Sequence, residues 1–109
     1  MDSRQQRVAR NEALFREVNE RIREINAEMA GDEMSDFLCE CGDDECTQAI
    51  VLAPHEYEAV RANPKRFVIV PGHEIPDVER VISVNERFMV VEKEPPAAAR
   101  IAIESDPRS

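Results

Sequence analysis

A chain of 109 residues is long enough for one small domain, and its five aromatic residues, none of them tryptophan, provide little apolar volume for a core. The formal net charge of −9 repels phosphate backbones, and no apolar stretch approaches the roughly 18 residues of a membrane span or forms the core of a signal peptide. Three cysteines, an odd number, are expected of a reducing compartment. The sequence therefore predicts a cytoplasmic protein without direct nucleic-acid or membrane binding, and it identifies no small-molecule substrate.

Residues 1–31 predict a long amphipathic helix. Ser3 to Met29 contain neither proline nor glycine, and Gly31 then ends the pattern. The apolar residues follow heptad spacing along one seam, which consists of Val8, Phe15, Val18, Ile22, Ile25 and Met29. Asn11 is the polar position of that seam. The charged residues, Arg16 and Glu20 among them, are interpreted as a solvated opposite face.

Part of this seam is expected to bind another protein surface. A helix of this length spans roughly 40 Å, which exceeds the diameter of the small domain that follows. The predicted contact residues are Phe15, Val18, Ile22, Ile25 and Met29. The partner is either a different protein or a second copy in a homodimeric coiled coil. An alternative that the sequence leaves open is that the seam folds back over the domain's own sheet.

The rest of the chain predicts a small α+β domain. An acidic connector at 32–36 precedes the domain at 37–93, and a tail at 94–109 is either flexible or a short helix over 97–104. One helix begins at Pro54 and ends near Ala62, because Asn63-Pro64 stops it, and Tyr57 and Val60 face inward. Strands are predicted at 50–52, 66–70, 78–84 and 88–92, the last two as an antiparallel hairpin.

A cysteine knuckle is the most specific chemical feature. Cys39, Cys41 and Cys46 lie within eight residues, and Pro71-Gly72 can turn His73 back toward them. Three thiolates and one imidazole form a closed tetrahedral set suited to structural Zn²⁺. His55, an acidic residue or water are alternatives for the fourth ligand, and three small core residues without any metal are the alternative to the whole site.

Acidic residues surround these thiols in the sequence: Glu40, Asp43, Asp44 and Glu45. Negative neighbours disfavour a thiolate, so the thiols are expected to have raised pKa values and to be poor nucleophiles unless a cation binds. Because Zn²⁺ deprotonates its ligand thiols, the pattern favours metal binding over a catalytic cysteine.

Several motifs resemble a family of small uncharacterised actinobacterial proteins. They are Phe37-Leu38-Cys39-Glu40-Cys41, Cys46-Thr47, Glu56-Tyr57-Glu58-x-Val60-Arg61, Pro64-x-Arg66-Phe67, Pro71-Gly72-His73 and Val90-Val91-Glu92-Lys93. The segment from Asn11 to Arg21 looks like part of the same pattern. The resemblance implies a bacterial cytosolic setting and a single unit of helix plus domain, and it implies no substrate.

The function predicted from the sequence is that of a non-enzymatic, zinc-stabilised regulatory or adaptor protein that acts through protein contacts of its N-terminal helix. A thiol-based redox or metal sensor is the first alternative, in which Cys39, Cys41 and Cys46 lose zinc on oxidation. A zinc-dependent hydrolase with Glu40 or Glu74 as general base is the second, and it requires a water at the fourth metal position.

Overall fold

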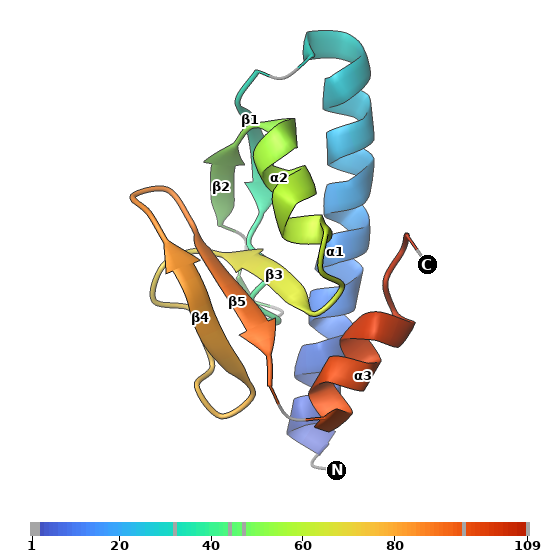
Figure 1. The fold of residues 1–109 in the computed structure, drawn as a ribbon, viewed down its shortest axis with the longest axis vertical. Helices are drawn as coiled ribbons and strands as arrows, with labels where there is room; N and C mark the ends of the chain where they lie inside the picture. Colours follow the sequence, from blue (N-terminus) through green and yellow to red (C-terminus); the bar gives the residue numbers. More distant parts are fainter. Residues whose placement is uncertain (1–2, 32, 44, 47, 95, 109) are drawn as a thin grey trace.

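A computed structural model describes residues 3–31, 33–43, 45–46, 48–94 and 96–108. Its elements are α1 (Ser3–Ala30), β1 (Ser35–Leu38), β2 (Ala49–Leu52), α2 (Pro54–Arg61), β3 (Arg66–Ile69), β4 (Glu79–Val84), β5 (Met89–Lys93) and α3 (Pro96–Glu104). As Figure 1 shows, α1 runs along one side of the molecule, and the strands and α2 occupy the other side. The predicted α+β fold with a long N-terminal helix is confirmed.

Two antiparallel sheets form the β structure. β1 pairs with β2, and β5 lies between β3 and β4 in the second sheet. The predicted hairpin of β4 and β5 is confirmed, and its turn is fixed by Asn85, whose Oδ1 accepts the backbone N–H groups of Arg87 and Phe88 at 2.8 and 2.9 Å. β1 begins at Ser35, inside the stretch that the sequence assigned to the connector.

The apolar core lies between the two sheets, α2 and the helices that flank them. Phe37 of β1 stacks on Tyr57 of α2 with ring centroids 4.9 Å apart, and both side chains are buried. Val60 is also buried, so the predicted inward face of α2 is confirmed. Pro54 occupies the first turn of α2, where the missing backbone N–H does no harm.

The tail contains α3, the helical one of its two predicted forms, and α1 holds it in place. The Arg16 guanidinium donates to the backbone oxygens of Ala102 at 2.5 Å and Pro64 at 2.7 Å, and it lies 4.5 Å from the centroid of the Phe67 ring. Arg108, beyond α3, forms an ion pair with Glu20 of α1 at 2.9 Å.

The face of α1 that packs on the domain is polar, which corrects the sequence interpretation. Glu12, Arg16, Asn19 and Glu20 are all buried, whereas Arg16 and Glu20 were assigned to a solvated face. The physical reason is that α1 lies against backbone carbonyls and buried ion pairs. Such groups need hydrogen-bonding partners, which apolar side chains cannot supply.

The seam divides between core and solvent. Ile22 is partly buried and packs against the core, and Phe15 is half-buried, whereas Val18, Ile25 and Met29 are exposed. Only part of the seam therefore folds back over the domain. Among the described residues, no helix combines the length and the apolar character that crossing a bilayer requires.

Candidate metal centre

The ligand candidates come from two segments that the fold brings together. Cys39 and Cys41 directly follow β1, Cys46 precedes β2, and His73 lies in the turn after β3. Their ligand atoms all lie within 4.8 Å of one another. The Nδ1 atom of His73 is 3.6 Å from the Sγ atom of Cys39 and 3.7 Å from that of Cys46. These four residues could therefore hold one metal ion, as the sequence predicted.

Backbone geometry on the His73 side aims the imidazole at the sulfurs. The His73 N–H donates to the Val70 carbonyl at 3.0 Å, and Gly72 between them has a φ of +97°, a conformation that other residues rarely adopt. The Val70 N–H donates to the Cys39 Sγ at 3.2 Å. Such amide donors stabilise a thiolate and fix the orientation of a ligand sulfur.

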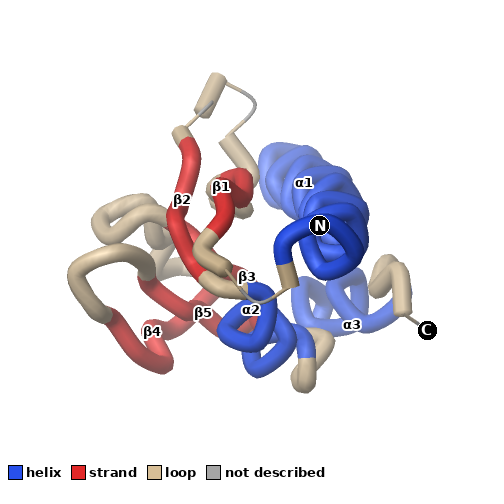
Figure 2. Tube along the Cα trace, turned by 90° about the horizontal axis from the view of Figure 1, so that it is seen from above, coloured by secondary structure: helices blue, strands red, loops and turns tan. Residues whose placement is uncertain are grey.

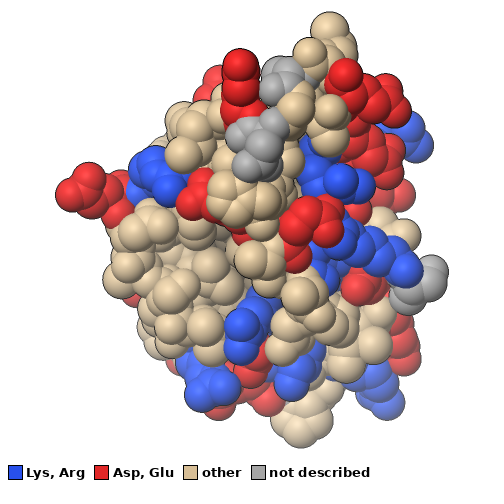
Figure 3. All heavy atoms as spheres, turned by 45° about the horizontal axis from the view of Figure 1, so that its top comes forward, with Lys and Arg blue, Asp and Glu red and all other residues tan. Residues whose placement is uncertain are grey.

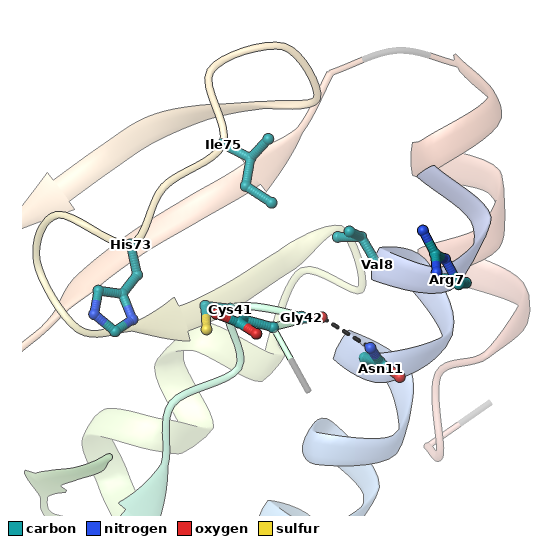
Figure 4. A pocket seen from close by; sticks show the side chains of 8 residues that line it. Arg7, Val8, Asn11, Cys41, Gly42, His73 and Ile75 are labelled. Carbon is teal, nitrogen blue, oxygen red and sulfur yellow. Dashed lines mark hydrogen bonds between the residues drawn. The ribbon is translucent and has the colours of Figure 1, made fainter. Parts of the chain in front are cut away.

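The knuckle is also fixed against α1. Gly42 has a φ of +83°, and a Cβ atom there would lie 2.8 Å from side-chain atoms of both Val8 and Glu12. The Asn11 side chain donates to the Gly42 carbonyl at 3.0 Å, as the dashed line in Figure 4 shows. Asn11, the polar position of the predicted seam, therefore docks the knuckle on the helix.

The three thiols do not share one pKa shift. A hydrogen bond from the Cys39 thiol lowers the pKa of Cys41 to about 5, with help from the Asp43 amide, and the same bond raises the pKa of Cys39. Burial raises the pKa of Cys46. The expectation of raised values is therefore wrong for Cys41, because neighbouring donors stabilise its thiolate.

Glu40 faces away from the sulfurs, which corrects its assignment to the acidic surroundings of the thiols. Its side chain is fully buried, and burial raises its pKa. Its carboxylate accepts hydrogen bonds from the Val68 N–H at 3.0 Å, the Asn19 amide at 2.9 Å and the Tyr57 hydroxyl at 2.8 Å. Glu40 thus joins α1, α2 and β3 behind the knuckle. Asp43 and Glu45 are exposed, and Asp44 lies outside the described residues.

An open cavity of about 500 Å³ adjoins the cluster. In Figure 4, His73 and Cys41 lie at one side of it, and Val8 and Arg7 of α1 lie at the other. His55, the alternative fourth ligand, is exposed in the first turn of α2 and does not belong to the ligand cluster.

A cluster of buried charged residues near the metal-ligand candidates was not predicted from the sequence. The Lys93 Nζ lies 2.6 Å from a Glu12 carboxylate oxygen and 2.5 Å from one of Glu79, and all three side chains are buried. Burial raises the pKa of Glu12 to about 8 against the opposing effect of Lys93. On α2, Arg61 pairs with Glu20 and Asp106. The sequence signal for this cluster was a lysine directly after the predicted apolar strand 88–92.

Comparisons with protein-family models, curated proteins and solved structures found no match to this chain. The interpretation of the site therefore depends on its own residues and geometry.

Proposed function

We propose that this protein binds one structural Zn²⁺ through Cys39, Cys41, Cys46 and His73, and that it acts without catalysis as a regulatory or adaptor protein through contacts of α1. The observation that carries the zinc proposal is the spacing of the ligand atoms. Zinc bonds of about 2.3 Å to sulfur and about 2.0 Å to nitrogen place sulfur and nitrogen about 3.5 Å apart in a tetrahedron. The separations of His73 from Cys39 and Cys46 are 3.6 and 3.7 Å.

The chemistry of the donors supports a structural ion. Three thiolates and an imidazole satisfy zinc completely, which leaves no position for a catalytic water, and three thiolates make the metal a weak Lewis acid. Glu40, one of the two bases of the hydrolase alternative, already accepts three hydrogen bonds in the interior. These features favour a zinc that links the knuckle to the turn after β3.

Metal content tests the zinc proposal. Protein purified without added metal is analysed by elemental mass spectrometry, beside Cys41→Ser, His73→Ala and the matched control His55→Ala. We expect one zinc per chain in the native protein and in His55→Ala, and weakened or lost zinc in the other two variants. Retention of stoichiometric zinc by His73→Ala would overturn the ligand set.

The contact proposal is supported by the exposed part of the seam. Ile25 and Met29 are 55% and 82% exposed, although they continue the apolar seam beyond Ile22, which is partly buried against the core. The test is association of the zinc-loaded chain, either with itself or with an added basic amphipathic helix. Met29→Glu should abolish association, and Val84→Glu on β4, where Val84 is 58% exposed, should not. Equal behaviour of the two variants would contradict a role for α1.

A sensor is a second candidate, because the knuckle is bonded directly to α1. Asn11 binds Gly42, and Asn19 binds both Leu38 and Glu40, so a loosened knuckle would weaken the docking of the helix. Peroxide oxidises two ligand thiolates to a disulfide, is itself reduced to water, and releases the zinc. Zinc release and increased hydrogen exchange in α1 would support this candidate, whereas zinc retention under peroxide would remove it.

A further inference from the structure

The outer side of α1 carries an apolar stripe that the described fold leaves exposed. Its four members, here called the outer stripe, are Leu14, Val18, Ile25 and Met29, which are 54%, 38%, 55% and 82% exposed. At about 100° per residue, these side chains lie within roughly 60° of one another around the helix axis. Figure 2 shows α1 at the edge of the molecule with β1, α2 and α3 all on one side of it. The outer stripe therefore faces away from the domain.

On the flank next to the outer stripe, four exposed charged residues lie within about 40° of one another around the helix axis: Arg10, Glu17, Arg21 and Glu28; the exposed Glu24 lies farther round the helix. Their charges alternate as plus, minus, plus and minus. If a second, antiparallel copy of α1 is aligned so that the two Asn19 residues lie at the same level, Arg10 lies opposite Glu28 of the other copy. Glu17 then lies opposite Arg21. Each charge then lies opposite its complement. Ion pairs between described residues include none of these four side chains.

The charges of α1 also oppose its own dipole. Its first turn has no acidic residue and its last turn has no basic one, while Arg7 and Arg10 lie near the N-terminus and Glu24 and Glu28 near the C-terminus. A helix dipole favours the reverse arrangement. An antiparallel copy of α1 places its C-terminus beside the N-terminus of the first helix. The acidic residues and the negative dipole end of one helix then lie beside the basic residues and the positive dipole end of the other.

We infer that the outer stripe binds the outer stripe of a second copy in an antiparallel, two-fold symmetric pair. This inference rests on the proposed contact function of α1 and names its partner. Leu14 of one protomer then packs near Ile25 of its partner. Arg10 pairs with Glu28 across the axis, and Glu17 pairs with Arg21. An antiparallel arrangement brings the same flank of both helices together, which a parallel one does not.

The net charge of −9 does not prevent this pairing. Exposed charges separated by more than about 8 Å are screened at physiological salt, so the local pairs along α1 decide the contact. On the face shown in Figure 3, basic and acidic side chains lie next to one another.

Sedimentation equilibrium of the zinc-loaded full chain tests the inference by charge reversal. We expect a reversible dimer whose dissociation constant rises about 10-fold in Arg10→Glu and similarly in Glu28→Arg, because each change creates two repulsive contacts in the symmetric pair. The double variant should recover native affinity. An equimolar mixture of the two single variants should recover it as well, because each then supplies the complement of the other. Arg100→Glu, the same change at an exposed position of α3, is the matched control.

Recovery in the double variant is the decisive result. In a parallel pair the same flank of the two helices lies on opposite edges of the contact, so Arg10 does not meet Glu28 and joining the two substitutions would not restore the affinity. Failure to recover, or a chain that stays monomeric up to about 1 mM, would overturn the inference. A monomer that still binds a basic amphipathic helix through Met29 would leave the proposed contact function intact, and unchanged zinc content would show that the metal centre is independent of both.

Discussion

The two sides of α1 differ in which side chains they bury: the inner side buries polar residues, and the outer side exposes apolar ones. The inner side buries charged and amide side chains, and Arg16 and Asn19 are completely buried. The outer side exposes the outer stripe, and Met29 is its most exposed member. In most surface helices the apolar side faces the core. Which side chains of α1 are buried therefore depends on the groups that the helix packs against, and these are backbone edges and buried charges.

The inner side is specific in a way that an apolar contact is not. The Asn19 amide accepts the Leu38 N–H at 2.7 Å and donates to the Leu38 carbonyl at 2.9 Å, so it pairs with β1 as a neighbouring strand would. These two bonds therefore fix the position of Asn19 against β1. The outer side has no such constraint within the described fold, and it is available for another surface.

The largest effect is expected from breaking the buried cluster on the inner side. Lys93→Met removes the cation between Glu12 and Glu79 and leaves the buried carboxyl groups of both residues without it. We expect the free energy of unfolding in urea to fall by about 3–5 kcal/mol. The matched change Lys65→Met, at a half-buried position, should lower it by less than about 1 kcal/mol. Equal losses of unfolding free energy in Lys93→Met and Lys65→Met would show that the buried cluster does not stabilise the fold more than an ordinary lysine does.

Asn19→Ala should have the next largest effect. The substitution leaves the Leu38 amide and carbonyl without their side-chain partner and removes one donor from Glu40. Unsatisfied buried groups lower stability by about 1–3 kcal/mol each, so we expect a loss of about 3 kcal/mol. Asn26→Ala on the same helix, where Asn26 is half-buried, is the control. A loss below about 1 kcal/mol would mean that α1 is not held by this pairing.

Glu12 on the inner side should make the stability of the fold depend on pH. The pKa of Glu12 is raised from 4.5 to about 8, so the folded protein binds a proton that the unfolded chain releases. Its contribution is present below pH 4.5 and is lost as the pH rises through about 8. Between pH 6 and pH 8, we expect the native chain to lose about 2 kcal/mol relative to Glu12→Gln. Urea denaturation of both proteins at several pH values measures the difference, and parallel curves would contradict it.

The smallest effect on stability is expected on the outer side. Ile25→Glu should change the free energy of unfolding by less than about 0.5 kcal/mol, because Ile25 is already more than half exposed. The same variant should lose self-association in sedimentation equilibrium. If Ile25→Glu unfolds the chain, then the outer stripe belongs to the fold and the comparison between the two sides fails.

Local patterns predicted much of this fold. Pro54 and Asn63-Pro64 delimit α2, and the short connection between two apolar runs predicts the hairpin of β4 and β5. The cysteine spacing and Pro71-Gly72 correctly brought His73 to the knuckle. These predictions succeeded because the responsible groups are close in sequence or because few residues have suitable ligand chemistry.

The remaining features depend on contacts that no local pattern encodes. Glu12 and Lys93 are 81 positions apart and look like ordinary surface residues until the fold brings them together. Heptad spacing located the apolar seam of α1 but could not show which side of the helix meets the domain. In the sequence, Glu40 is an acidic residue between two cysteines. Only the tertiary structure shows that its side chain is buried in the interior.

The ligand shell of the proposed zinc ion is the decisive measurement for the metal centre. X-ray absorption at the zinc edge, recorded on protein purified without added metal, reports the number, type and distance of the ligand atoms. We expect three sulfur atoms at about 2.3 Å and one nitrogen at about 2.0 Å, and the zinc that His73→Ala still retains should keep the sulfurs without that nitrogen. A shell with fewer than three sulfurs, an oxygen ligand from water, or a spectrum unchanged by His73→Ala would contradict this ligand set.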